Sequence, residues 1–129
     1  PFTAIACVDR LGSALCRLAR RDMPAPFRFD SQGRLWLVAP GSLFAGILDL
    51  AFNQIRQNTR SNPAVVIRML GAIAQIADHV RHAQDTACLQ RHAGMIVRGA
   101  REAVPQADDL HGVDAAFAKA SPALRGRSA

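Results

Sequence analysis

The strongest constraint on the fold of this chain is the spacing of its apolar residues, which recur every three or four positions. Such spacing places residues on one side of an α-helix, whereas a half-buried strand would alternate at every second residue. The sequence therefore predicts an amphipathic helix from Phe2 to about Arg21. Its apolar face consists of Ile5, Val8, Gly12, Leu15 and Ala19.

Four later segments repeat this pattern, and residues that start or stop helices bound each of them. Ser42 and Asp85 suit N-caps, and Asn62 followed by Pro63 suits an N-cap and the first helical position. Pro122, after Ser121, is expected to end the last helix. The predicted helices run from Ser42 to about Arg60, from Pro63 to about His82, from Thr86 to Val104 and from Asp108 to Ala120.

A short stretch between the first two helices predicts a β-hairpin. Phe27–Phe29 and Leu35–Val38 flank the sequence Asp30-Ser31-Gln32-Gly33, in which Asp caps a turn and Gly tolerates positive φ. Two strands alone are marginally stable in water. We therefore expect one face of the hairpin to pack on the helices through Phe27, Phe29, Leu35 and Leu37.

Composition supports a mainly helical domain. Half of the 129 residues are hydrophobic, aromatic residues make up only 5% and tyrosine is absent, a mixture that favours helices over sheets. The length suits one domain. We predict an all-α, bundle-like fold of four to five helices, with a small hairpin near residues 27–38. The domain is expected to cover residues 1–120, followed by a mobile tail at 121–129.

The charge balance and the cysteines bear on the partners and the compartment. The formal charge of +6 can attract nucleic acid, acidic proteins or anionic lipid headgroups, but aromatic and basic residues do not alternate as in base-stacking surfaces. Nucleic acid is therefore not expected as a partner. Three cysteines without metal-type spacing fit a reducing cytosol. The longest uncharged apolar stretch, Leu35–Leu48, is too short to span a bilayer as a helix.

The most informative polar segment is 51–63, where amides and arginines gather at a junction of two helices. Asn53, Arg56 and Arg60 share an outer stripe with Asp49, which a solvated helix face would explain. Gln54 and Asn58 instead project within the apolar arc predicted for this helix, where an unpaired amide would cost about 1–3 kcal/mol. They are expected to be buried, either fixing the helix junction or binding a ligand. The predicted arc consists of Phe44, Ile47, Leu48, Ala51 and Ile55.

The histidines do not form a recognisable metal or catalytic motif. His79 and His82 lie three apart with Asp78 beside them, but zinc needs three or four convergent ligands. His92 borders an apolar stripe and is expected to hydrogen-bond a neighbouring helix. No nucleophile elbow or glycine-rich loop is present, so we expect no catalysis, metal or cofactor. The candidate polar interaction site consists of Asn53, Gln54, Arg56, Asn58, Arg60, Asn62, Arg68 and His92.

Several sequence strings resemble the predicted bacterial membrane protein family called domain of unknown function 2254. The resemblance covers nearly all of the chain, the last short helix and tail excepted. It implies transmembrane helices and an intervening soluble region before this piece, which would be a carboxy-terminal helical part truncated at its start. The matching strings are Pro1-Phe2-Thr3-Ala4, Cys7–Gly12, Ala51–Gln57, Arg60–Val65 and Leu89–Ile96.

The resemblance implies no activity, and the function hypotheses remain broad. The first is a soluble, cytoplasmic accessory or regulatory domain of a protein of the bacterial inner membrane, attached through transmembrane segments absent here. Its ligand is unknown and a homo-oligomer stays open. One alternative is a nucleic-acid-binding domain that presents Arg68, Gln75, His79 and His82 from the third helix; another is a metal-dependent enzyme.

Overall fold

Five helices and one hairpin succeed one another in the computed structural model, which describes residues 1–38 and 44–125. This confirms the predicted all-α class with a small hairpin. The helices are α1 (Phe2–Ala19), α2 (Phe44–Thr59), α3 (Pro63–Ala77), α4 (Ala83–Ala103) and α5 (Ala107–Leu124). The strands are β1 (Phe27–Phe29) and β2 (Leu35–Val38).

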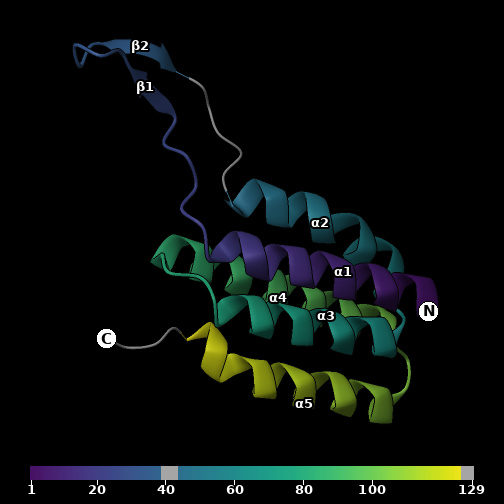
Figure 1. Ribbon diagram of the computed structural model, residues 1–129. Helices are drawn as coiled ribbons and strands as arrows, with labels where there is room; N and C mark the ends of the chain where they lie inside the picture. The colour runs from purple at the N-terminus through teal and green to yellow at the C-terminus, as the bar shows by residue number, and fades with distance from the viewer. Residues whose placement is uncertain (39–43, 126–129) are drawn as a thin grey trace.

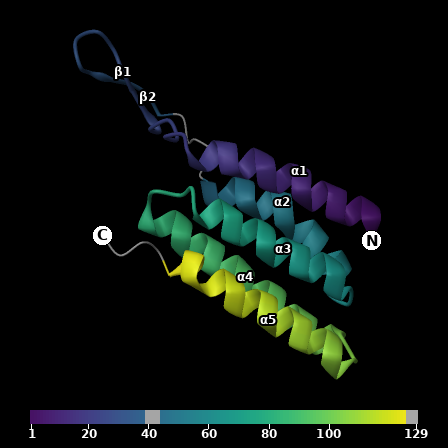
Figure 2. The ribbon, with the colours of Figure 1, turned by 60° about the horizontal axis from the view of Figure 1, so that its bottom comes forward.

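Helix α3 occupies the centre of the bundle. It packs against α1, α4 and α5, and both ribbon views show it between α1 and α5 (Figures 1 and 2). A helix with neighbours on several sides must be apolar on several sides. The buried residues of α3 are accordingly Val65, Val66, Met69, Leu70, Ala72, Ile73, Ile76 and Ala77.

Helix α1 lies against α3 through the face that its periodicity predicts. Its buried residues are Val8, Gly12, Leu15 and Ala19. A β-carbon at position 12 would lie 3.2 Å from the Cβ of Ala72, so glycine allows the two helices to approach closely. The ion pair between Asp9 and Arg68 joins the same two helices at the surface.

The start of α3 confirms the predicted cap. The side-chain oxygen of Asn62 accepts a hydrogen bond from the backbone N–H of Val65 at 3.3 Å, and Pro63 is the first helical residue. The cap predicted at Ser42 falls outside the described residues.

The end of α3 and the start of α4 differ from the prediction. Helix α3 ends at Ala77, five residues before His82, although Val80 still packs against the core. Helix α4 begins at Ala83, and His82 is its N-cap residue. Asp85 therefore lies in the first turn of α4 and does not cap it, but a negative charge there still interacts favourably with the helix dipole.

Helix α5 continues past Ser121-Pro122, where the sequence predicts its end. A proline in the last turn removes one backbone donor, but two side-chain hydrogen bonds near the end of the helix offset this loss. The hydroxyl of Ser121 donates to the carbonyl of Phe117 at 2.9 Å, and Gln90 of α4 donates to the carbonyl of Leu124 at 2.6 Å. Leu124 is buried. Residues 121–124 therefore belong to the packed helix and Arg125 is its C-cap residue, whereas residues 126–129 of the predicted tail lie outside the described residues.

The hairpin forms as predicted but does not pack on the helices. Asp30 accepts hydrogen bonds from the backbone N–H groups of Gln32 and Arg34, and Gly33 has a φ of 75°. The two strands project away from the bundle (Figure 1). The reason lies in the linker before β1, where Pro24 and Pro26 favour an extended backbone that leads the chain away from α1. The expected packing of Phe27, Phe29, Leu35 and Leu37 is wrong, because all four side chains are exposed.

Candidate functional site

The register of α2 determines which polar side chains face α4. Its buried residues are Phe44, Leu48 and Phe52, spaced four apart. Phe52, which lies outside the predicted apolar arc, is fully buried. The buried face of α2 is therefore rotated about the helix axis from the predicted arc toward Phe52. This rotation brings Asp49 and Arg56 to the border of the core, where both are half-buried.

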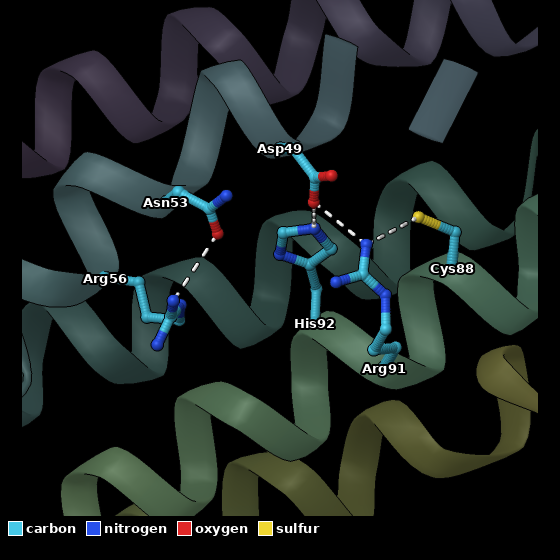
Figure 3. A network of polar contacts seen from close by, with 6 residues as sticks. All are labelled: Asp49, Asn53, Arg56, Cys88, Arg91 and His92. Atoms are coloured by element: carbon cyan, nitrogen blue, oxygen red, sulfur yellow. Dashed lines mark hydrogen bonds and ion pairs between the residues drawn. The ribbon is translucent and has the colours of Figure 1, made fainter. Parts of the chain in front are cut away.

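Asp49 and His92 form the centre of a polar network between α2 and α4 (Figure 3). His92 is fully buried, and its Nε2 lies 2.7 Å from Oδ1 of Asp49. Arg91 donates to the same carboxylate oxygen at 2.9 Å and to Sγ of Cys88 at 3.6 Å. The network thus joins the two helices through one carboxylate, and it bears out the expected hydrogen bond of His92 to a neighbouring helix.

The surroundings determine the charge of each group in this network. Burial lowers the pKa of His92, although the hydrogen bond to Asp49 acts in the opposite direction and the positive charge of Arg91 adds to the lowering. The hydrogen bond from Arg91 lowers the pKa of Asp49, and that from His92 adds to this effect. At neutral pH the pair is therefore a neutral imidazole that donates from Nε2 to a carboxylate.

This arrangement predicts that the protein loses stability on mild acidification. An unfolded chain takes up a proton on histidine below pH roughly 6.5, whereas folded His92 resists protonation because its pKa is lowered. Stability should therefore be full above that pH and fall as the pH drops from about 6.5 to 5.5, by up to about 1 kcal/mol. Thermal unfolding of the wild type and of His92→Leu at both pH values measures this difference. If His92→Leu lost as much stability as the wild type over this pH range, the loss would not come from protonation of His92.

A second part of the site holds two buried atoms without partners. Arg56 donates to Oδ1 of Asn53 at 3.5 Å, but within the described residues its Nε has no hydrogen-bond partner. The same holds for Nδ1 of His92. Figure 3 shows this nitrogen on the side of the ring that faces Asn53 and Arg56. Because buried polar atoms are rarely left unsatisfied, each of these atoms indicates a place for a water or ligand atom.

The surface next to Arg56 is hollowed into a groove between α2 and α4, here called the arginine groove. Its volume is about 290 Å³. Three arginines and one glutamate line it, so its lining residues carry a net positive charge. The lining residues are Arg56, Gln57, Arg60, Met95, Arg98, Gly99 and Glu102.

The structure brings together only part of the predicted polar site. Asn53, Arg56, Arg60 and His92 lie along the contact of α2 and α4, whereas Asn62 caps α3 and Arg68 pairs with Asp9 of α1.

The expected burial of Gln54 and Asn58 is wrong. Both are exposed, and the side-chain amide of Asn58 only donates to the carbonyl of Gln54 within the same helix, at 2.8 Å. The rotation of the buried face toward Phe52 explains this, because it turns both amides into solvent.

Sequence reasoning missed the residues that complete the site, namely Asp49, Cys88, Arg91 and Arg98. Asp49 was placed on the solvated stripe. The available signal was Phe52, whose spacing from Leu48 and Phe44 would have moved the predicted face toward Asp49.

The remaining histidines lie apart from this site. His79 contacts the guanidinium of Arg20 at 3.2 Å, and His111 lies 4.0 Å from Asp108 on the surface. Among residues 1–38 and 44–125, no group of three or more His, Cys, Asp or Glu side chains is arranged to hold a metal ion. Arg68, expected on a groove-binding third helix, instead pairs with Asp9 of α1, and His79 lies beyond the end of α3 and contacts Arg20, so the geometry does not favour the nucleic-acid alternative.

Comparison with known protein families shows which family the chain belongs to. The model of a family described as "Predicted membrane protein (DUF2254)" matches residues 1–75, more than half of the chain. The chain belongs to the DUF2254 family. The family model ends before the resembling string at 89–96, so that part of the resemblance lies outside the match. No helix in the described part of this DUF2254 chain is long and apolar enough to cross a membrane.

Curated relatives extend the similarity along the chain. Uncharacterized proteins of Mycobacterium bovis and Mycobacterium tuberculosis are 28% identical over 121 residues, which is 94% of this chain. The chain spans about a quarter of the length of these relatives, since the aligned part is 23% of each. No solved structure matches the chain.

Proposed function

We propose that this chain is an accessory, regulatory domain on the cytoplasmic side of a bacterial membrane protein, and that it binds an anionic ligand in the arginine groove. Membership of a family of predicted membrane proteins supports the first part. The second part rests on the groove itself, which Arg56, Arg60 and Arg98 line and where the buried Nε of Arg56 has no partner within the described residues.

The chemistry of the groove favours a small oxyanion, such as a phosphate group. Guanidinium groups bind phosphate and carboxylate oxygens through strong, charge-assisted hydrogen bonds. Glu102 offsets part of the positive charge, which favours an anion of low charge over a polyanion such as nucleic acid. An oxygen atom of the ligand near Arg56 would accept a hydrogen bond from its Nε.

Regulation would follow from the position of the groove. Helices α2 and α4 meet both at the Asp49–His92 contact and at the groove, so an anion between them stabilises one arrangement of the two helices. A ligand that favours one arrangement shifts the population toward it.

The test is a calorimetric titration of the 129-residue chain with inorganic phosphate at low salt. Arg98→Gln removes one guanidinium of the groove and is expected to weaken binding about tenfold or more, because a hydrogen bond to a charged group contributes about 1.5–3 kcal/mol. Arg10→Gln is the matched control, since Arg10 is exposed on α1, away from the residues that line the groove. Equal affinities of the two variants, or no binding by the wild type, would count against the proposal.

A further inference from the structure

The hairpin carries the largest group of exposed apolar side chains in the described part of the protein. Trp36 is 77% exposed, a fraction that a soluble surface rarely gives to a tryptophan with apolar neighbours. Single exposed apolar residues are ordinary, but here six are consecutive or paired across two strands. They are Phe27, Phe29, Leu35, Trp36, Leu37 and Val38.

Both faces of the hairpin carry exposed apolar side chains. Successive side chains of a strand point to opposite faces. Trp36 and Val38 therefore lie on one face of β2, and Leu35 and Leu37 lie on the other. A protein surface that docked on the hairpin would cover one face and leave the other in water. A lipid interface surrounds an inserted element and covers both.

The charges near the hairpin suit an anionic bilayer. Arg28 and Arg34 lie on or next to the strands, and Arg20 and Arg21 follow the end of α1, from which the linker leads to the hairpin. Only Arg34 has a carboxylate partner among them in the described residues, Asp30 at 2.9 Å. The guanidinium groups of arginines can bind lipid phosphates, and aromatic side chains favour the depth of the lipid headgroups.

The depth of insertion is limited by the backbone. The outer edges of a two-stranded sheet carry unpaired N–H and C=O groups, which are costly to place in hydrocarbon. The turn at residues 30–33 is also polar. These features favour a hairpin that lies at headgroup depth over one that crosses into the hydrocarbon core.

We propose that the β1–β2 hairpin inserts into the headgroup region of an anionic lipid bilayer and holds the helical bundle against the membrane. The inference stands on the hairpin alone and does not depend on anion binding in the arginine groove.

Trp36 provides a direct readout, because it is the only tryptophan and the chain has no tyrosine. The 129-residue chain is mixed with vesicles of phosphatidylcholine containing about 30% phosphatidylglycerol, whose charge attracts basic segments. Trp36 emission is expected to shift to shorter wavelength and to become protected from aqueous acrylamide. Vesicles of pure phosphatidylcholine should bind at least about tenfold more weakly.

Variants separate insertion of the hairpin from general attraction of a basic protein. The double variant Phe27→Ser and Phe29→Ser is expected to weaken vesicle binding at least about tenfold, and to unfold at the same temperature as the wild type because both side chains are exposed. Leu50→Ser is the matched control, since Leu50 is 84% exposed on α2 and should bind as the wild type does.

Three results would overturn the proposal. The first is no binding to anionic vesicles at low salt. The second is binding during which Trp36 stays in an aqueous environment, which would place the contact on the bundle. The third is a blue shift of Trp36 that rises with protein concentration without lipid, which would identify a second copy of the chain as the occupant.

Discussion

Replacing Phe52 with alanine is expected to lower the free energy of unfolding by about 3–5 kcal/mol, the range for removing a large buried aromatic side chain. Phe52 is fully buried and is the largest side chain in the described core to be so. Urea denaturation followed by circular dichroism measures the change. Leu50→Ala, two residues away on the exposed side of α2, should change stability by less than about 0.5 kcal/mol.

The comparison of these two variants also tests the orientation of α2. If Leu50→Ala lowered stability more than Phe52→Ala, the opposite face of α2 would pack on the core. Asp49 would then not contact His92. The expected order therefore supports the geometry of the site as well as the core.

Replacing Asp49 with alanine is expected to cost about 1–3 kcal/mol, because it leaves Nε2 of the fully buried His92 without its acceptor. In a His92→Leu background the same change should cost much less, since no buried donor is then left unpaired. The difference is a coupling energy of at least about 1 kcal/mol between two residues in direct contact.

A double-mutant cycle from four urea unfolding curves measures this coupling. If the two substitutions changed the free energy of unfolding additively, Asp49 would stabilise the protein mainly through Arg91, which is half-exposed and donates to the same oxygen. Asp114→Ala supplies a control, because the ion pair of Asp114 with Arg101 lies on the surface and should contribute less than about 1 kcal/mol.

The local signals in the sequence predicted most of the architecture. Periodicity gave the buried face of α1, and Asn62 with Pro63 gave the start of α3, because both features depend on neighbours within one or two turns. The continuation of α5 past Pro122 depends on a hydrogen bond from Gln90, a residue 34 positions away. Single-helix patterns carry no information on such a contact.

The candidate site was predicted less well for the same reason. A helix wheel separates polar and apolar residues, but the choice between Gln54 and Asp49 at the edge of the core required knowing that Phe52 is buried and that α4 is the neighbour. Arg98 and Cys88 lie on α4 and enter the site only through packing of the two helices. Likewise, the strands of the hairpin could be located, but the direction in which the linker carries them could not.

The order of the helices along the chain has a consequence for how the molecule assembles. Helices α2, α3, α4 and α5 are joined by the short segments 60–62, 78–82 and 104–106, whereas a long segment, 20–43, separates α1 from α2. Contacts between segments close in sequence form fastest, and long loops must close before distant contacts stabilise them. We therefore expect α2, α3, α4 and α5 to associate first, with α1 docking later. The contact of α1 with α3, including the close approach of Gly12 to Ala72, would then be the last part of the bundle to form and the first to be lost on unfolding.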